Sequence, residues 1–380
     1  MLKRVLSVVF LLCGLTVGLL AEGGPWGIHL SWQHDPATTM TIMWRMEPGE
    51  VEAMVEYGPT PQLGERALGT RTSYVYARKE VIWYVAELTG LSPKTTYFYR
   101  CGTPGNWSDI YSFTTAPLPD DPRASFSFAV LADTPGKGGY AVTGKLLEMA
   151  EADGADFVIF GGDFTAGGAQ PEFDYWFNSA PEVLARLPLL SVLGDNDGLS
   201  RAYFGSFSYP GDESWYFLDC GPVRFIFLLA VSEPYVRQQT PWLAEVLQSA
   251  STPWKIAVGH KPAYSAGWYG PTDYILDQWV PLFERCGLDI YFNGHEHSYE
   301  RTWPIKGGCL CADGVVYVTA SGAGSDLREP GQEFWTAKAA SVFHYVLVQV
   351  KPTELTVFAK DIDGNVFDHF RVRNPGKEGG

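Results

Sequence analysis

Positive charge is scarce in this sequence: 28 Lys and Arg residues stand against 43 Asp and Glu, which leaves a formal net charge of -15. Proteins that bind nucleic acid through its phosphate backbone display an excess of Lys and Arg over at least one face. The deficit therefore argues against a nucleic-acid scaffold as partner. The content of 46% hydrophobic and 14% aromatic residues predicts instead an acidic globular protein with a full core.

Long apolar runs are missing from the chain except at its N-terminus. Met1–Arg4 is charged and Val5–Leu20 is almost wholly apolar, which is the pattern of a secretory signal. We therefore expect residues 1–21 to be a signal peptide and the protein to be secreted, to an extracellular or periplasmic compartment, without a stable membrane anchor. The alternative is an uncleaved anchor, because the run approaches the length that spans a bilayer and Leu19-Leu20-Ala21 is a poor cleavage site.

Cysteine is scarce as well, with six residues in the chain. Removal of Cys13 with the signal leaves five, an odd number, so at least one thiol should stay free. Cys309 and Cys311 lie close together, but no second pair stands at the spacing of a zinc knuckle. A disulfide from this pair to Cys286, or plain thiols, is the remaining expectation, and we assign these cysteines no chemistry.

Short runs of alternating apolar residues fill the first part of the chain. Examples are Met40–Trp44, Val81–Val85 and Ile110–Phe113, with Gly and Pro between the runs. Period-two patterning between turn residues predicts an antiparallel β-sandwich over residues 22–118. The Pro- and Asp-rich stretch Ala116–Pro122 has no apolar periodicity, and we place the domain boundary there.

In the second domain, residues 119–380, strands alternate with helical stretches. Ser125–Leu131 and Asp156–Phe160 have the pattern of strands, and Val142–Ala152 between them has that of an amphipathic helix. A βαβ unit of this kind predicts parallel neighbouring strands and an α/β domain. Further strands are expected at Leu189–Leu193, Trp254–Val258 and Leu288–Phe292.

Each of these strands is followed by Asp or His. A single Asp at such a place is ordinarily a turn residue or a helix cap, and an H-x-H pair alone is weak support for a metal site. Open α/β sheets, however, bind ligands at the carboxyl ends of their strands, so the topology brings the whole set to one crevice. The set comprises Asp133, Asp163, Asp195, His260, His295 and His297.

Three carboxylates and three imidazoles suit a pair of iron, manganese or zinc ions better than calcium or magnesium. Two such ions serve displacement at phosphorus, because they clamp the phosphate oxygens and turn a bound water into hydroxide at neutral pH. The sequence therefore predicts hydrolysis of a phosphate ester. The ligand types alone also leave aminopeptidase and oxygen chemistry open.

The order of these motifs, and above all the stretch Gly294-His295-Glu296-His297-Ser298-Tyr299-Glu300-Arg301, resembles the calcineurin-like metallophosphoesterases. With the preceding sandwich the chain is most similar to the purple acid phosphatases, in which a fibronectin type III-like domain precedes the catalytic one. The resemblance implies a two-sheet αββα sandwich for residues 119–380. It implies two metal ions, iron with zinc, manganese or a second iron. The implied ligands are Asp163 as the bridge, Asp133 and His297 on the first ion, and Asp195, His260 and His295 on the second.

The sequence departs from the purple acid phosphatase pattern at residues that matter for chemistry. Where the family has a metal-bound tyrosine this chain has Ala166, and where it has an asparagine ligand this chain has Asp195. A histidine that serves the substrate is replaced by Asn196. The family's further substrate histidines fall here on Tyr269 and Gly270.

From the residues present, we expect Asn196 and Tyr269 to contact the substrate. Asn196 can donate a hydrogen bond but cannot transfer a proton, so Asp197 is the rival catalytic residue, because the charge of Asp195 beside it would raise its pKa. The aromatic loop Tyr264–Tyr269 either forms a lip over the site or packs as ordinary surface.

Two functions follow as hypotheses. The first is an exported two-metal phosphoesterase that acts on small phosphomonoesters or diesters. The second is a metal-binding but catalytically silent protein in which the sandwich mediates attachment. The six converging ligands favour the enzyme, whereas the replacement of every histidine that would touch the substrate favours the silent protein.

Overall fold

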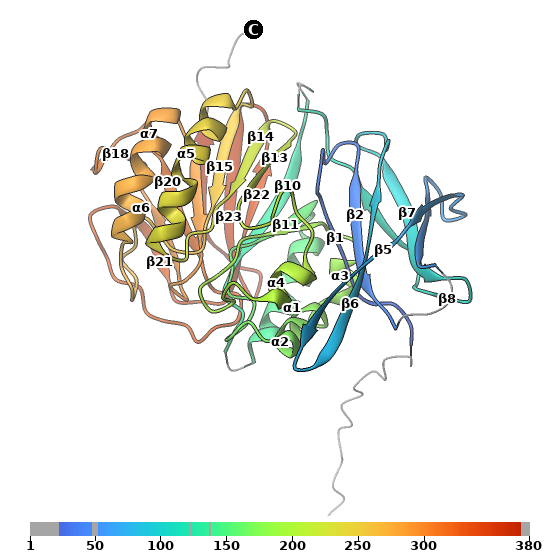
Figure 1. The fold of residues 1–380 in the computed structure, drawn as a ribbon. Coiled ribbons are helices and arrows are strands. Elements are labelled where there is room, and N and C mark those ends of the chain that lie inside the picture. The colour runs from blue at the N-terminus through green and yellow to red at the C-terminus, as the bar shows by residue number, and fades with distance from the viewer. Residues whose placement is uncertain (1–22, 48–51, 120, 122, 137, 374–380) are drawn as a thin grey trace, which may run out of the picture.

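The computed structural model describes residues 23–47, 52–119, 121, 123–136 and 138–373. The expected signal peptide, residues 1–21, lies outside the described residues. Figure 1 shows the N-terminal β-domain on one side and the larger α/β domain on the other. Among the described helices, none has the length and apolar character needed to cross a bilayer.

The N-terminal domain is a sandwich of two antiparallel sheets, as the alternating pattern predicts. In β6, Val81 and Trp83 are buried while Ile82 between them is only partly covered, so the period-two pattern sorts the two faces of the strand. The first sheet has the order β1(Trp26–Ser31), β2(Met40–Arg45), β6(Lys79–Leu88), β5(Thr70–Tyr76). The second has β4(Glu65–Leu68), β3(Met54–Gly58), β7(Thr96–Thr103), β8(Asn106–Trp107), with β9(Tyr111–Thr114) also paired to β7.

The second domain contains two mixed sheets and a small hairpin, β18(Ile305–Lys306) with β19(Cys309–Leu310). The six-stranded sheet has the order β12(Leu189–Ser191), β11(Phe157–Phe160), β10(Phe126–Leu131), β22(His344–Val350), β23(Glu354–Asp361), β24(Val366–Arg373). The seven-stranded sheet has β13(Tyr216–Cys220), β14(Val223–Phe227), β15(Trp254–Val258), β16(Ile290–Asn293), β20(Val316–Ala320), β17(Tyr299–Thr302), β21(Thr336–Ala340). The strands that precede the candidate ligands, β10 to β12 and β15 to β16, are parallel to their neighbours in these two groups.

The two sheets pack face to face through aromatic side chains. Phe128 of β10 meets Phe225 of β14 edge to face, with 5.0 Å between the ring centres. On the other face of β14, Ile226 belongs to a second apolar cluster with residues of α5 such as Leu243, and Figure 1 shows α5, α6 and α7 on this outer side. The predicted αββα arrangement is thus confirmed. The helices are α1(Gly139–Ala152), α2(Gln170–Phe177), α3(Pro181–Leu184), α4(Arg201–Ser206), α5(Glu233–Ser249), α6(Asp273–Gln278) and α7(Val280–Cys286).

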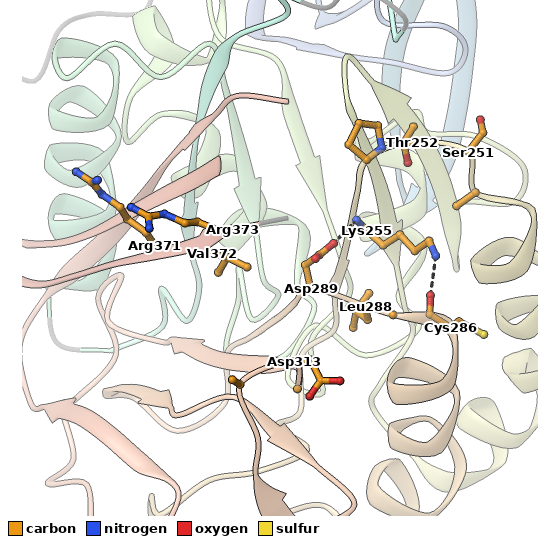
Figure 2. A pocket seen from close by; sticks show the side chains of 15 residues that line it. Ser251, Thr252, Lys255, Cys286, Leu288, Asp289, Asp313, Arg371, Val372 and Arg373 are labelled. Carbon is orange, nitrogen blue, oxygen red and sulfur yellow. Dashed lines mark hydrogen bonds between the residues drawn. The ribbon is translucent and has the colours of Figure 1, made fainter. Parts of the chain in front are cut away.

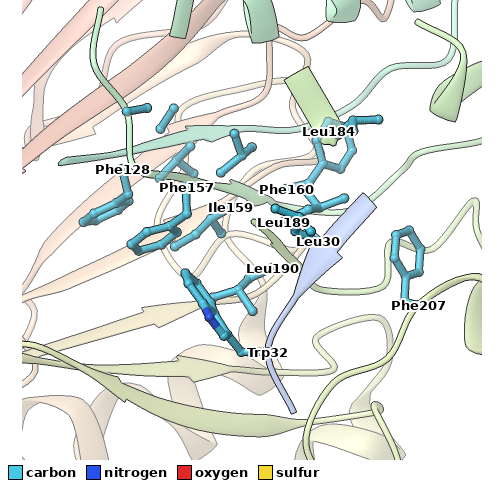
Figure 3. Packing of buried hydrophobic residues seen from close by; sticks show 14 of the residues in the cluster. Leu30, Trp32, Phe128, Phe157, Ile159, Phe160, Leu184, Leu189, Leu190 and Phe207 are labelled. Atoms are coloured by element: carbon cyan, nitrogen blue, oxygen red, sulfur yellow. The ribbon is translucent and has the colours of Figure 1, made fainter. Parts of the chain in front are cut away.

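The sandwich shares a core with the α/β domain. Leu30 of β1 and Trp32, just after that strand, pack toward β11 and β12 (Figure 3), and the Trp32 ring lies 5.5 Å from that of Phe157. Arg45 of β2 adds an ion pair to Asp174 of α2 at 2.6 Å. This contact fixes the sandwich against the side of the domain that carries α2 and α4.

A cavity of about 820 Å³ lies at the amino ends of the parallel strands, where Lys255 is the second residue of β15 and Asp289 precedes β16 (Figure 2). Its cations are already engaged: Lys255 donates to the carbonyl oxygen of Cys286 at 2.6 Å, and Arg373 pairs with Glu354 at 3.1 Å. Since ligands of α/β sheets bind at the opposite, carboxyl ends of the strands, the candidate site has to be sought there.

The described cysteines are free thiols. Cys101 and Cys220 are buried, and Cys286, Cys309 and Cys311 form no disulfide with one another. Of the two expectations for the last three, plain thiols is the one that the structure bears out.

Candidate metal centre

The six predicted ligands lie in loops that leave the carboxyl ends of both sheets. Asp133, Asp163 and Asp195 follow β10, β11 and β12 of the six-stranded sheet, whereas His260, His295 and His297 follow β15 and β16 of the seven-stranded sheet. The centre therefore sits where the two sheets meet, with its carboxylates on one side and its imidazoles on the other.

The backbone at these turns has an uncommon conformation. Asp133, Asp163, His295 and His297 have φ of 69°, 57°, 77° and 55°. Side chains other than Gly rarely adopt this left-handed region, and residues held there cluster at functional sites. Four of the six predicted ligands share this feature, which turns their side chains away from the strand direction and into the crevice.

The glycines beside the ligands are required by close approach. A Cβ on Gly194 would meet Oδ1 of Asp163 at 2.1 Å, and one on Gly294 would meet Oδ2 of Asp133 at 2.5 Å. Neither glycine has a positive φ. Their role is thus to admit a carboxylate against bare backbone.

One group of ligand atoms is formed by Asp195, His260 and His295. Oδ1 of Asp195 lies 2.9 Å from Nε2 of His260 and 3.1 Å from Nδ1 of His295. The two imidazole nitrogens are 3.3 Å apart. Atoms that each lie ~2.1 Å from one ion stand roughly 3–4 Å from one another, so this group has the spacing of a shared ion.

A second group is formed by Asp133, Asp163 and His260. Nε2 of His260 lies 3.4 Å from Oδ2 of Asp163, so His260 belongs to both groups. The sequence resemblance put His297 in this second place, and its Nε2 lies 3.8 Å from Oδ1 of Asp133. Five of the six predicted ligands therefore form two groups that share His260, and the sixth, His297, lies beside Asp133 of the second group.

Neighbouring groups hold the ligands in place. Nδ1 of His260 lies 2.9 Å from the carbonyl oxygen of Gly161, which fixes the ring orientation. Asp133 accepts hydrogen bonds from the hydroxyl of Ser321 at 2.6 Å and from the backbone N–H of His295 at 2.9 Å. Such outer partners orient metal ligands and set their basicity.

The electrostatics of the centre call for added positive charge. Burial raises the pKa of Asp133 to about 8 and lowers the pKa of His297 to about 4, the latter with a contribution from the nearby charge of Arg328. Burial opposes the charged form of Asp195 too, but hydrogen bonds with His260 and His295 hold its pKa well below the usual range. A cation favours carboxylates and neutral imidazoles, so the donor set fits divalent or trivalent ions.

Asn196 and Asp197, the two predicted catalytic residues, have different positions. Asn196 is exposed, and its amide donates to Oδ2 of Asp163 at 2.6 Å. Asp197 is fully buried behind Asp163 and accepts hydrogen bonds from the backbone of Asp163, Thr165 and Gly194 and from the Thr165 hydroxyl, at 2.9–3.0 Å. The structure thus places Asp197 among the groups that support the ligands, and its role as the rival acid stays a prediction.

Tyr269, the other predicted substrate contact, stacks on His295 with 4.3 Å between the ring centres and an angle of 26°. Its side chain is 53% exposed. Tyr264, at the start of the same loop, packs instead against Tyr317 in the core at 4.9 Å. The aromatic loop is therefore divided: its first residue is ordinary packing and its last forms a wall of the centre.

Two buried carboxylates that sequence reasoning left without a role hold this loop. Oε2 of Glu296 accepts from the backbone N–H of Tyr269 at 3.0 Å, and Oε2 of Glu300 accepts from that of Ala266 at 2.7 Å. Both belong to the stretch that contains the ligand histidines, and this closeness in sequence was the available signal. Arg328 was missed as well, and no motif surrounds it.

Comparison with known proteins agrees with this geometry. Residues 126–299 match the family described as calcineurin-like phosphoesterase, and residues 25–115 match the purple acid phosphatase N-terminal domain. The chain thus combines a purple acid phosphatase N-terminal domain with a calcineurin-like phosphoesterase domain. The expectation of a phosphoesterase with a purple acid phosphatase sandwich is confirmed at the level of the family.

Relatives of this phosphoesterase extend over nearly its whole length. The mouse protein acid phosphatase type 7 is 28% identical over 409 aligned positions, which cover 92% of this chain and 91% of the mouse protein. The structure of purple acid phosphatase PPD1 from yellow lupin has a TM-score of 0.81 at 19% identity and covers 92% of this chain and 74% of its own. GAP50, described as the anchor in the inner membrane complex of Plasmodium, has a TM-score of 0.53 at 16% identity and covers 67% of this chain and 90% of its own.

Proposed function

We propose that this chain is an exported phosphatase that uses two metal ions to hydrolyse phosphomonoesters or diesters. The observation that carries the proposal is that the ligand atoms form two groups in the crevice, Asp195 with His260 and His295, and Asp133 with Asp163 and His260. A single metal site would need only one of them. The charged, then apolar, N-terminal sequence supports export.

In this proposal Asp163 bridges the ions, Asp133 and His297 complete the first site, and Asp195, His260 and His295 complete the second. The ions would be iron with zinc, manganese or a second iron, which suit mixed imidazole and carboxylate ligands. When bound, they supply positive charge for the phosphate oxygens and a water of lowered pKa.

The chain's own residues orient these groups around the ester. Asn196 holds both oxygens of Asp163, and Asp197 fixes the backbone of the same residue from behind. Tyr269 covers His295 and offers its exposed ring to the organic part of the substrate. Asn196 itself cannot protonate the leaving oxygen, because an amide donates a hydrogen bond but does not transfer its proton.

The alternative is a protein that binds metal without turnover. It is favoured by the position of Asn196, whose amide is occupied by Asp163. It is also supported by the resemblance in fold to GAP50, which is described as an anchor. In this case the metal centre would have only a structural role, and the sandwich would mediate attachment.

Metal content and hydrolysis, measured on the same preparation, separate the two proposals. We expect two metal ions per chain and turnover on a panel of aryl and alkyl phosphomonoesters and diesters, with both lost in Asp163→Asn. Asn tolerates the left-handed backbone found at this residue, so the variant should fold. Bound metal without turnover on any ester would reject the enzyme and leave the alternative. Export is tested by the N-terminus of the protein secreted from the full chain, which should begin near residue 22.

A further inference from the structure

We propose that Arg328 binds the phosphate group of the substrate beside the two-metal centre and that it takes the place of the substrate histidines that the chain lacks. The inference rests on the proposed function, because it names the substrate group that the centre accepts. It further implies a preference for phosphomonoesters, whose second negative charge the guanidinium would neutralise, over diesters.

The backbone ties Arg328 to a predicted metal ligand. Its N–H donates to the carbonyl oxygen of His297 at 3.0 Å, so the residue lies beside the turn that carries His297. Arg328 reaches this place from the loop that follows β20, a segment far from the ligand motif in sequence order. Its position relative to the centre is therefore set by the fold and not by a local motif.

The side chain lies against the aromatic wall of the same centre. The guanidinium carbon of Arg328 is 4.7 Å from the centre of the Tyr269 ring, and that ring stacks on His295 at 4.3 Å. The Tyr269 ring thus contacts both the guanidinium of Arg328 and the ring of His295. A ring face attracts a guanidinium and holds it flat, so Tyr269, itself held by Glu296, positions the cation.

Arg328 has no carboxylate partner among the described residues. Nη1 is buried and makes no hydrogen bond, and no carboxylate lies within ion-pair distance of the side chain. The partly buried arginines elsewhere in the described chain do have partners. They are Arg45 with Asp174, Arg100 with Glu56, Arg186 with Glu151, Arg224 with Asp219 and Arg301 with Asp368.

A buried donor without a partner is costly, and such groups in native structures ordinarily have a ligand or a function. The chain has 43 acidic residues, yet no described carboxylate pairs with Arg328. A phosphate group supplies what is missing, because its oxygens accept two parallel hydrogen bonds from one guanidinium. The unpaired cation, its aromatic support and its contact with a ligand turn together indicate an anion-binding residue.

The test measures binding of inorganic phosphate to the metal-loaded protein by calorimetry, so that it does not depend on turnover. In R328Q we expect the dissociation constant of phosphate to rise roughly tenfold or more, as the loss of a charge-assisted hydrogen bond predicts, with metal content unchanged. R328K should recover part of the affinity, since it restores the charge without the planar fork. R237Q is the matched control: Arg237 is an exposed arginine of α5 that pairs with Glu233, and its variant should bind phosphate like wild type.

The same variants test whether Arg328 favours phosphomonoesters over phosphodiesters. R328Q should lose more kcat/KM on aryl phosphomonoesters than on the corresponding diesters. A phosphate affinity of R328Q within twofold of wild type, or loss of metal from R328Q in parallel with the loss of phosphate, would overturn the proposed contact. A different outcome would reject the proposed function alone. If wild-type protein binds two metals and phosphate but hydrolyses no ester, and R328Q binds phosphate more weakly, the enzyme is rejected and the role of Arg328 stands.

Discussion

The amide of Asn196 donates to Oδ2 of Asp163 at 2.6 Å, while the backbone N–H of Asn196 donates to Oδ1 of the same carboxylate at 2.9 Å. One residue therefore holds both oxygens of the side chain that is expected to bridge the two metals. Asp197 completes the arrangement by accepting the backbone N–H of Asp163. Asn196 thus has two possible partners, the bridging ligand and the substrate, and its contribution to each can be measured.

Replacement of Asn196 by Ala should weaken metal binding. The variant loses the side-chain donor to Asp163 but keeps the backbone donor, and the loss of one outer partner costs about 10-fold to 100-fold in metal affinity. Competition with a chelator, followed by elemental analysis, measures the effect. Asn178→Ala serves as the control, because Asn178 caps the end of α2 and its amide donates only to the backbone of Asp174. Equal metal retention in the two variants would show that the contact with Asp163 has no role in binding.

Turnover should depend steeply on the acidity of the leaving group. A positioned general acid contributes about 10²–10⁴-fold, and the amide of Asn196 cannot act as one. Aryl phosphates should therefore be hydrolysed much faster than alkyl phosphates, and Asn196→His should help the alkyl esters more than the aryl esters. Rates across a series of leaving groups provide the measurement.

The structure also bears on Asp197 as the rival acid. Both its oxygens accept hydrogen bonds and its side chain is fully buried, and burial together with the charge of Asp163 raises its pKa to about 7. A raised pKa suits an acid, but the burial gives the proton no path to an ester. A shallow dependence on leaving-group acidity that disappears in Asp197→Asn would nevertheless make Asp197 the acid.

Asp163→Asn and His297→Gln should differ in the number of metals they lose. Only a bridging carboxylate serves two centres, so the first variant should lose or scramble both ions, whereas the second should loosen mainly one. Metal-to-protein ratios after dialysis give the answer. His369→Gln is a suitable control, since His369 is an exposed residue of β24 that stacks on Phe358 away from the centre. Full occupancy in Asp163→Asn would contradict its assignment as the bridge.

Iron-loaded protein should not be purple. A phenolate bound to ferric iron gives the strong visible band, and Ala166 occupies the place of the family's tyrosine ligand. Ala166 is exposed, and its backbone N–H donates to Glu172. Absorption spectra of the iron form test this expectation. A strong band would point to Tyr269, whose ring already lies on His295, and Tyr269→Phe should then abolish it.

The sequence was sufficient for the parts of the centre that follow from topology. Strand ends and the βαβ order predicted that Asp133 and Asp163 would meet His260, because parallel strands deliver their carboxyl ends to one edge. Spacing along the chain did not tell which way a side chain points. Asp197 stands two residues from Asp195, yet one is buried behind the centre and the other faces it.

Long-range contacts account for the rest of what could not be predicted. Arg328 meets Tyr269 only because two separate loops converge, and a single arginine in a loop carries no pattern. The contact of Leu30 and Trp32 with the α/β domain likewise depends on how two folded units dock. The alternating pattern of the sandwich strands predicts which faces are buried, but it does not identify the surface that covers them.

The docking of the two domains leads to the last prediction, which concerns stability in acid. His29 of β1 is fully buried, stacks on Phe177 of α2 at 4.7 Å and meets Trp83 of β6 edge to face at 5.4 Å. Burial lowers its pKa to about 4 from an ordinary value of 6.5, and its Nε2 has no hydrogen-bond partner. The ring is thus neutral where the sandwich and the α/β domain meet.

The sign follows from proton uptake. Between pH 6.5 and 4 the unfolded chain binds a proton at His29 and the folded chain does not, so the free energy of unfolding falls as the pH falls through this range, by ~1.4 kcal/mol per pH unit for one group. Above pH 6.5 His29 does not change the free energy of unfolding.

Denaturant unfolding at pH 7 and pH 4.5 should therefore show a loss of stability in acid. Groups at the metal centre titrate in the same range, so the difference between wild type and His29→Phe isolates this contribution. The phenyl ring keeps the stacking and removes the titration, so the pH dependence should be smaller in the variant than in wild type. The same pH dependence in His29→Phe and wild type would mean that His29 takes up its proton in the folded protein as readily as in the unfolded chain.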